Sequence, residues 1–119
     1  MVKFLVNPSR FNKFTDVILK PLVFITSFIL MIGLFLVYFS PSDYQQGLTV
    51  KIMYIHVPSA WLALLTYAIM TIYSIIGLAF KIPFSFIINK AIAPIGAVFT
   101  LLCLISGSLW GKPMWGTWW

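Results

Sequence analysis

The chain has 119 residues, of which 61% are hydrophobic and only 8% charged, and its formal net charge is +6. Soluble domains carry about 25% charged residues, so this composition excludes an ordinary soluble domain. We therefore expect an all-α integral membrane protein in which residues 1–119 form a single membrane unit. The basic residues lie at the ends of apolar runs, which indicates membrane topology rather than nucleic-acid binding.

The first predicted membrane helix covers residues 21–39, which contain no charged side chain. At about 1.5 Å per residue this run crosses a hydrocarbon core of about 30 Å. It is longer than the core of a typical signal peptide, and no Ala-x-Ala cleavage site follows it. A polar outer loop over residues 40–57 comes next.

The second predicted helix covers residues 58–80, because Pro58 suits the first turn of a helix, where its missing N–H costs nothing. An inner loop over 81–90 is bounded by two lysines, and the third helix covers 91–110. A tryptophan-rich segment over 110–119 ends the sequence. Gly111, Pro113 and Gly116 predict that the regular helix does not continue into it.

The distribution of basic residues predicts the orientation. Four lie in the N-terminal segment and two bound the 81–90 loop, whereas only Lys51 and Lys112 lie on the opposite side. The positive-inside rule then places the N-terminus inside, and places the first loop and the tryptophan-rich segment outside.

Small residues recur at helical spacing in the second and third predicted helices, which favours close helix packing in lipid. In the third helix they are Ala93, Gly96, Thr100, Cys103 and Gly107. In the second helix the corresponding face passes through Ala60, Ala63, Tyr67, Ser74 and Gly77. Cys103, the only cysteine, is interpreted as a packing residue; with no Cys-x-x-Cys-His motif, covalent haem attachment is not predicted.

All five tryptophans fall near the predicted outer face, and four of them crowd the last ten residues: Trp110, Trp115, Trp118 and Trp119. Two interpretations stay open for them. They could form an interfacial aromatic belt, or a shaped platform for a flat apolar ligand.

His56 is the only histidine and directly precedes the expected helix start at Pro58. A neutral imidazole is a common axial ligand of haem iron, and a helix N-terminus disfavours the imidazolium form. The alternative is an interfacial histidine that donates to a loop carbonyl. Together with the tryptophans, His56 forms a candidate haem site; Lys51 and Lys112 on the same side could pair with propionates or simply be solvated.

Four segments resemble the cytochrome c maturation protein C family, also called haem exporter protein C (CcmC). They are Asp43–Gly47 (DYQQG), Tyr54–Pro58 (YIHVP), Ala93–Thr100 (APIGAVFT) and Gly107–Trp119 (GSLWGKPMWGTWW). The resemblance covers nearly the whole chain beyond the N-terminal segment, with motif order and spacing preserved, and its last motif is highly specific.

The resemblance implies haem handling and delivery for c-type cytochrome biogenesis on the outer face of the inner membrane, without enzymatic activity. It implies a b-type haem held transiently and non-covalently, with His56 as an axial ligand of the iron. Trp110, Trp115, Trp118 and Trp119 would form the start of its tryptophan-rich platform. The implied partners are the haem chaperone protein E, the ABC transporter proteins A and B, and the small protein D.

The sequence departs from the family pattern in its length. Family members have six membrane helices and a second axial histidine in a later outer loop, whereas this sequence has three predicted helices and ends within the tryptophan-rich motif. A fragment, a decayed gene and one half of a split protein all stay open.

The alternative function is a structural subunit of a membrane complex in which the tryptophans anchor the helices at the lipid interface. A membrane enzyme is disfavoured because the sequence has no Cys/His or Ser/His/Asp set and only one outer carboxylate, Asp43. We expect a bacterial inner membrane, or a mitochondrial one if the gene is organelle-encoded, because the N-terminus is unlike a transit peptide.

Overall fold

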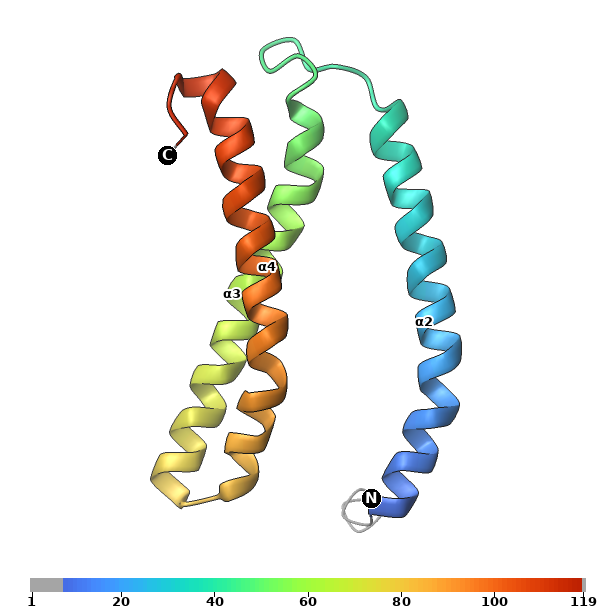
Figure 1. Ribbon diagram of the computed structural model, residues 1–119, viewed down its shortest axis with the longest axis vertical. Helices are drawn as coiled ribbons and strands as arrows, with labels where there is room; N and C mark the ends of the chain where they lie inside the picture. Colours follow the sequence, from blue (N-terminus) through green and yellow to red (C-terminus); the bar gives the residue numbers. More distant parts are fainter. Residues whose placement is uncertain (1–7, 119) are drawn as a thin grey trace. The chain divides into compact units, whose positions relative to one another are not determined.

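The structure is a computed structural model that describes residues 8–118. Within this range the chain forms three α-helices: α2 (Pro8–Phe39), α3 (Val50–Phe80) and α4 (Pro83–Trp115) (Figure 1). All three are long and apolar enough to cross a membrane. The predicted all-α membrane fold with three membrane helices is thus confirmed.

The chain divides into two compact units, one ending at Ser40 that holds α2 and one beginning at Pro41 that holds α3 and α4. That the whole chain forms a single membrane unit therefore stays a prediction.

Helix α2 begins well before the predicted start at residue 21, because it already includes Pro8. Pro21 lies inside the helix rather than at its beginning. Proline removes one backbone hydrogen bond from a helix interior, but the helix continues on both sides of it. No side chain of the apolar stretch Asn12–Phe39 is buried within the structure, as expected of a surface that faces lipid.

The start of α3 at Val50 corrects the predicted start at residue 58 and shortens the connection to residues 40–49. A tight turn explains the early start. Asp43 and Gly47 exchange backbone hydrogen bonds of 3.1 and 2.9 Å, and Gly47 has the positive φ of 59° that glycine adopts without steric cost. The chain has thus already turned when it reaches Thr49, so Pro58 lies inside α3.

The inner loop predicted over residues 81–90 is also shorter than expected, because only Lys81 and Ile82 separate α3 from α4. Lys81 adopts the left-handed conformation, with φ 54°, that commonly ends a helix. Pro83 then occupies the first turn of α4, where proline needs no hydrogen-bond acceptor. The helix-starting proline is therefore Pro83, and Pro94 lies inside the helix.

The end of α4 corrects the expectation that the helix stops near residue 110. It continues through Gly111 and Pro113 to Trp115. Gly116, with φ 77°, ends it, and the Gly116 N–H donates to the carbonyl oxygen of Lys112 at 3.0 Å. A left-handed glycine is the usual terminator of a helix, so the break falls at the second of the two glycines.

Small and hydroxylated residues form the contact between α3 and α4, as membrane helix pairs require. Ser59, Ala63 and Thr66 are buried on α3, and Ser85, Gly96 and Ser106 on α4. The predicted face of α4 is confirmed, since all of its members are buried or half-buried. The predicted face of α3 is wrong at Tyr67, which is 48% exposed, because neighbouring Thr66 makes the contact instead.

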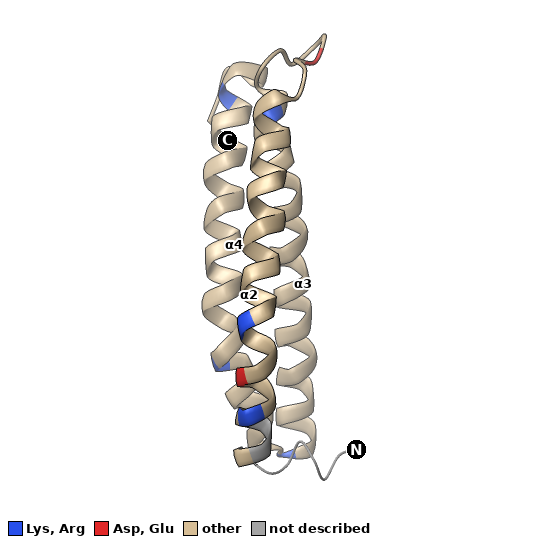
Figure 2. Cartoon of the chain, turned by 90° about the vertical axis from the view of Figure 1, so that its right-hand side faces the viewer, with Lys and Arg blue, Asp and Glu red and all other residues tan. Residues whose placement is uncertain are grey.

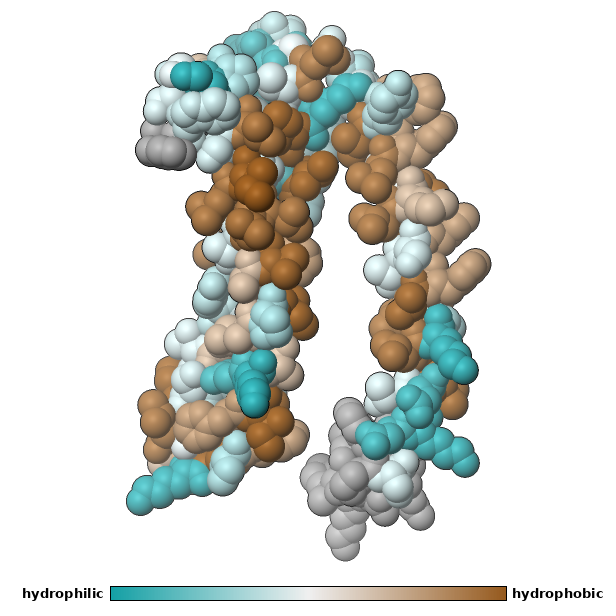
Figure 3. Space-filling view, in the orientation of Figure 1, coloured by the Kyte–Doolittle hydropathy of each residue, from teal (hydrophilic) through white to brown (hydrophobic). Residues whose placement is uncertain are grey.

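Large apolar side chains are exposed along both helices of the pair, and also along α2 (Figure 3). In the α3–α4 pair the basic residues lie toward the two ends, with long uncharged stretches between them (Figure 2). An apolar belt between charged ends is the surface that a bilayer stabilises.

We expect Gly96→Ala to weaken the α3–α4 contact, because an added Cβ would lie 2.8 Å from Cγ2 of Thr66. The overpacking destabilises the fold, and the better helix propensity of alanine offsets part of this effect. We expect the free energy of unfolding to fall by about 1–2 kcal/mol in total. Denaturant unfolding in mild detergent, followed by circular dichroism, measures the change. Gly33→Ala is the matched control because nothing lies within 4 Å of its Cβ; equal stability of the two variants would contradict the packing.

Candidate functional site

The α3–α4 pair forms an open pocket of about 410 Å³ at the end where α3 begins and α4 ends. We call it the tryptophan pocket. It is lined by Met53, His56, Cys103, Leu104, Gly107, Ser108, Trp110, Gly111, Trp115 and Trp118. Its size falls in the range of small-molecule and cofactor sites, about 300–1,000 Å³.

The structure brings four of the five sequence-predicted site residues together in this pocket: His56, Trp110, Trp115 and Trp118. His56 lies near the start of α3, whereas the three tryptophans lie at or just after the end of α4. The antiparallel arrangement of the two helices makes them neighbours. Trp119, the fifth, lies outside the described residues. Trp61 is 71% exposed and does not line the pocket.

Trp110 is held in place from two sides. Its indole Nε1–H donates to Oε1 of Gln46 at 2.8 Å, and its ring meets that of Trp115 edge-to-face, with the centroids 4.8 Å apart. Gln46 is itself fixed, because its backbone N–H donates to the Asp43 carboxylate at 2.8 Å. The turn that shortens the first loop therefore also anchors a wall of the pocket.

Trp118 lies on a segment that folds back over the end of α4. This segment lies close to the buried Gly111, where an added Cβ would be in ordinary van der Waals contact, at 3.4 Å, with the carbonyl oxygen of Thr117. Nζ of Lys112 donates to the Gly116 carbonyl at 3.0 Å and lies 5.5 Å from the ring centroid of Trp118, within cation–π range. Trp115 is 70% exposed and Trp118 46%, so this wall of the pocket is open.

His56 is half-buried against α4. Its Nδ1 lies 3.1 Å from the carbonyl oxygen of Cys103 and 3.1 Å from Oγ of Ser106. Gly107 lies directly beside the imidazole, because a Cβ there would be 2.9 Å from Cε1. The imidazole thus brings a nitrogen ligand into a mostly apolar, aromatic pocket, whose lining also contains the hydroxyl group of Ser108.

Sequence reasoning missed the residues that hold these side chains: Gln46, Ser106 and, as a neighbour of His56, Gly107. A signal was available for Gly107, because Cys103, Gly107 and Trp110 follow one another at the four- and three-residue steps of one helical face. Nothing in the sequence pairs Gln46 with Trp110.

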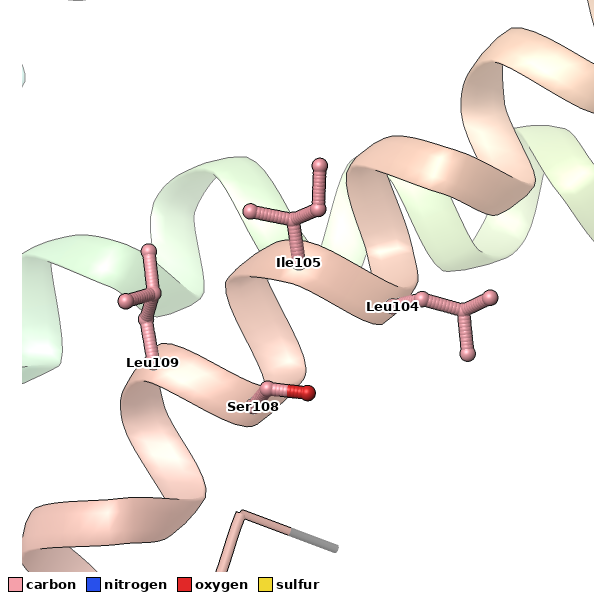
Figure 4. Close-up of a pocket in the computed structure, with 4 residues that line it drawn as sticks. All are labelled: Leu104, Ile105, Ser108 and Leu109. Carbon is pink, nitrogen blue, oxygen red and sulfur yellow. The ribbon is translucent and has the colours of Figure 1, made fainter.

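A second, more open depression of about 540 Å³ lies on α4 next to the tryptophan pocket. Leu104, Ile105, Ser108 and Leu109 line it (Figure 4). Leu104 and Ser108 line both hollows, but this one has neither an aromatic ring nor a metal ligand in its lining. Among the described residues, no group of three His, Cys, Asp or Glu side chains could hold a metal ion.

Long apolar helices with an aromatic pocket at one end define the chain as a multi-pass membrane protein. The family model of Heme exporter protein C (CcmC) matches residues 1–119, and the chain belongs to this family.

Three relatives agree with this assignment. Heme exporter protein C of Bradyrhizobium diazoefficiens is 50% identical over 115 residues, which are 97% of this chain and 44% of the relative. The protein of the same name in Escherichia coli K12 is 51% identical over 81 residues, or 68% of this chain and 33% of the relative. A ccmC-like mitochondrial protein of Marchantia polymorpha is 49% identical over 83 residues, which are 70% of this chain and 36% of the relative.

The chain therefore spans less than half the length of these relatives. Its apolar helices and its relatives in bacteria and in a mitochondrion identify it as a multi-pass inner-membrane protein.

Proposed function

We propose that the chain handles haem and delivers it for the biogenesis of c-type cytochromes, as part of the machinery to which its family belongs. The observation that carries the proposal is that His56 and three tryptophan rings line one pocket. The names of the relatives, which specify haem export and cytochrome c biosynthesis, support it.

The residues of the pocket fit haem as a cargo. Haem supplies a flat apolar ring and an iron that takes axial ligands. The rings of Trp110, Trp115 and Trp118 offer apolar faces to the porphyrin, and the imidazole of His56 offers a nitrogen to the iron. Nζ of Lys112, beside Trp118, is a cation suited to a propionate.

The binding would be b-type, non-covalent and transient. The chain has no Cys-x-x-Cys-His motif to form thioether bonds, and the partly exposed rings of Trp115 and Trp118 leave the pocket open for release. His56 would contribute one axial ligand to the haem iron. Because haem leaves unchanged, the role is one of binding and transfer, not of enzymatic catalysis.

The orientation and partners belong to the same proposal. The bias of basic residues supports an orientation in which the tryptophan pocket lies on the outer face of a bacterial inner membrane, or of a mitochondrial one if the gene is organelle-encoded. There, haem would pass to the haem chaperone protein E, while the transporter proteins A and B and the small protein D complete the assembly.

Titration with haem tests this function. We expect the parent chain in mild detergent to bind haem, and the binding to quench its tryptophan fluorescence. A titration of haem into empty micelles gives the background that is subtracted. Each aromatic contact contributes about 0.5–1.5 kcal/mol, so the triple variant Trp110→Leu, Trp115→Leu, Trp118→Leu should bind at least about tenfold more weakly.

Trp61→Leu is the matched control, because Trp61 lies outside the pocket, and its affinity should equal that of the parent. Equal affinity of the triple variant and the parent would instead favour the alternative function, in which the tryptophans anchor a structural subunit at the lipid interface.

A further inference from the structure

The hydrogen bonds around His56 determine which of its two ring nitrogens carries the proton. Nδ1 has two oxygen neighbours at 3.1 Å, the carbonyl oxygen of Cys103 and Oγ of Ser106. A carbonyl oxygen can only accept a hydrogen bond. The contact with Cys103 therefore requires a proton on Nδ1.

The hydroxyl of Ser106 imposes the same requirement. Its own hydrogen is directed to the carbonyl oxygen of Leu102, 2.5 Å away and one turn earlier in α4. With that hydrogen committed, Oγ presents only lone pairs to His56. The thiol of Cys103 could donate to Nδ1, but at 3.9 Å this weak donor does not outweigh two closer acceptors.

We propose that Ser106, together with the Cys103 carbonyl, is a positioning residue that holds His56 in the Nδ1–H tautomer, so that the lone pair of Nε2 is available to haem iron. This inference rests on the proposed function, in which His56 is an axial ligand. A ligating histidine is oriented, and its tautomer fixed, by what its other nitrogen donates to.

The packing around the ring reinforces this choice. Ser106 is 7% exposed, so its oxygen has little access to water as a replacement donor. If the imidazole turned over, a carbon would face the two acceptors and both would lose their bond. Oγ of Ser106 would then be a buried acceptor without a donor, which is unfavourable, so the neighbourhood selects one ring orientation as well as one tautomer.

The tautomer can be measured without haem. His56 is the only histidine, so ¹⁵N-histidine labelling gives one pair of ring-nitrogen signals in detergent. We expect Nδ1 to be protonated and Nε2 unprotonated in the parent. In Ser106→Ala the population should shift toward a mixture of tautomers, and Ser106→Thr, which retains the hydroxyl, should restore the parent pattern.

Ser85→Ala is the matched control, because Ser85 is also a buried serine of α4 but lies near its opposite end. It should leave the signals of His56 unchanged. A parent chain with the proton on Nε2, or a Ser106→Ala variant with an unchanged tautomer ratio, would overturn the inference.

Haem affinity provides the second readout. Loss of a group that orients a metal ligand typically costs 10–100-fold in affinity, so we expect about a tenfold loss in Ser106→Ala, recovered in Ser106→Thr. A parent that binds haem and a Ser106→Ala variant that binds it equally well would overturn the positioning role. A parent that binds no haem would refute the proposed function instead, while the nitrogen signals still test the tautomer.

Discussion

His56→Ala is expected to remove the imidazole-ligated haem band from the absorption spectrum of the purified chain. Loss of a group that merely orients a metal ligand costs about 10–100-fold in affinity, so loss of the ligand itself should cost about 100-fold or more. Expression with excess haem, purification in mild detergent and comparison of the spectra with the parent measure the effect.

Tyr54→Ala is the matched control for this experiment. Tyr54 lies on the same turn of α3 but is 51% exposed and does not line the tryptophan pocket, so its spectrum should equal that of the parent. An unchanged band in His56→Ala, after subtraction of haem in empty micelles, would show nonspecific binding and refute His56 as a ligand.

The second large effect is expected from Gly107→Ala, a change of one methyl group. The new Cβ would lie 2.9 Å from Cε1 and 3.4 Å from Nδ1 of His56, so the imidazole must move away from α4. That movement lengthens the hydrogen bonds of Nδ1, and we expect haem affinity to fall about tenfold or more.

The free energy of unfolding distinguishes a specific loss of haem binding from a general destabilisation of the fold. Alanine is a better helix former than glycine by about 1 kcal/mol, which offsets the cost of the new contact with His56. The free energy of unfolding should therefore change little, while haem binding weakens. Gly33→Ala, whose Cβ meets nothing within 4 Å, supplies the control. Parent-like haem binding by Gly107→Ala would show that the imidazole does not occupy this position when haem is bound.

The number and type of the helices could be predicted from the sequence, because long uncharged runs have few alternatives in a membrane protein. Their ends could not. Pro58 is predicted to begin the second helix, yet it lies inside α3, just as Pro94 lies inside α4. Each of these prolines removes one backbone hydrogen bond without ending its helix. The turn at Asp43–Gly47 and the left-handed Lys81 set the actual starts.

The candidate site was predictable to the extent that it depends on side-chain chemistry. A lone histidine and a cluster of tryptophans on one predicted face indicate His56 and Trp110 as candidate site residues, and both line the tryptophan pocket. The contacts that orient them join residues far apart in sequence, such as His56 with Ser106 and Gln46 with Trp110. These depend on how α3 and α4 cross, which periodicity alone does not specify.

The two-residue connection between α3 and α4 constrains how the tryptophan pocket can open. Three Cα steps join Phe80 to Pro83, so these helix ends cannot separate by more than about 11 Å. A rigid separation of the two helices is therefore a pivot about Lys81–Ile82, with α4 as the lever. Gly107 lies about 36 Å along α4 from that hinge, so a tilt of only about 5° changes the aperture by about 3 Å.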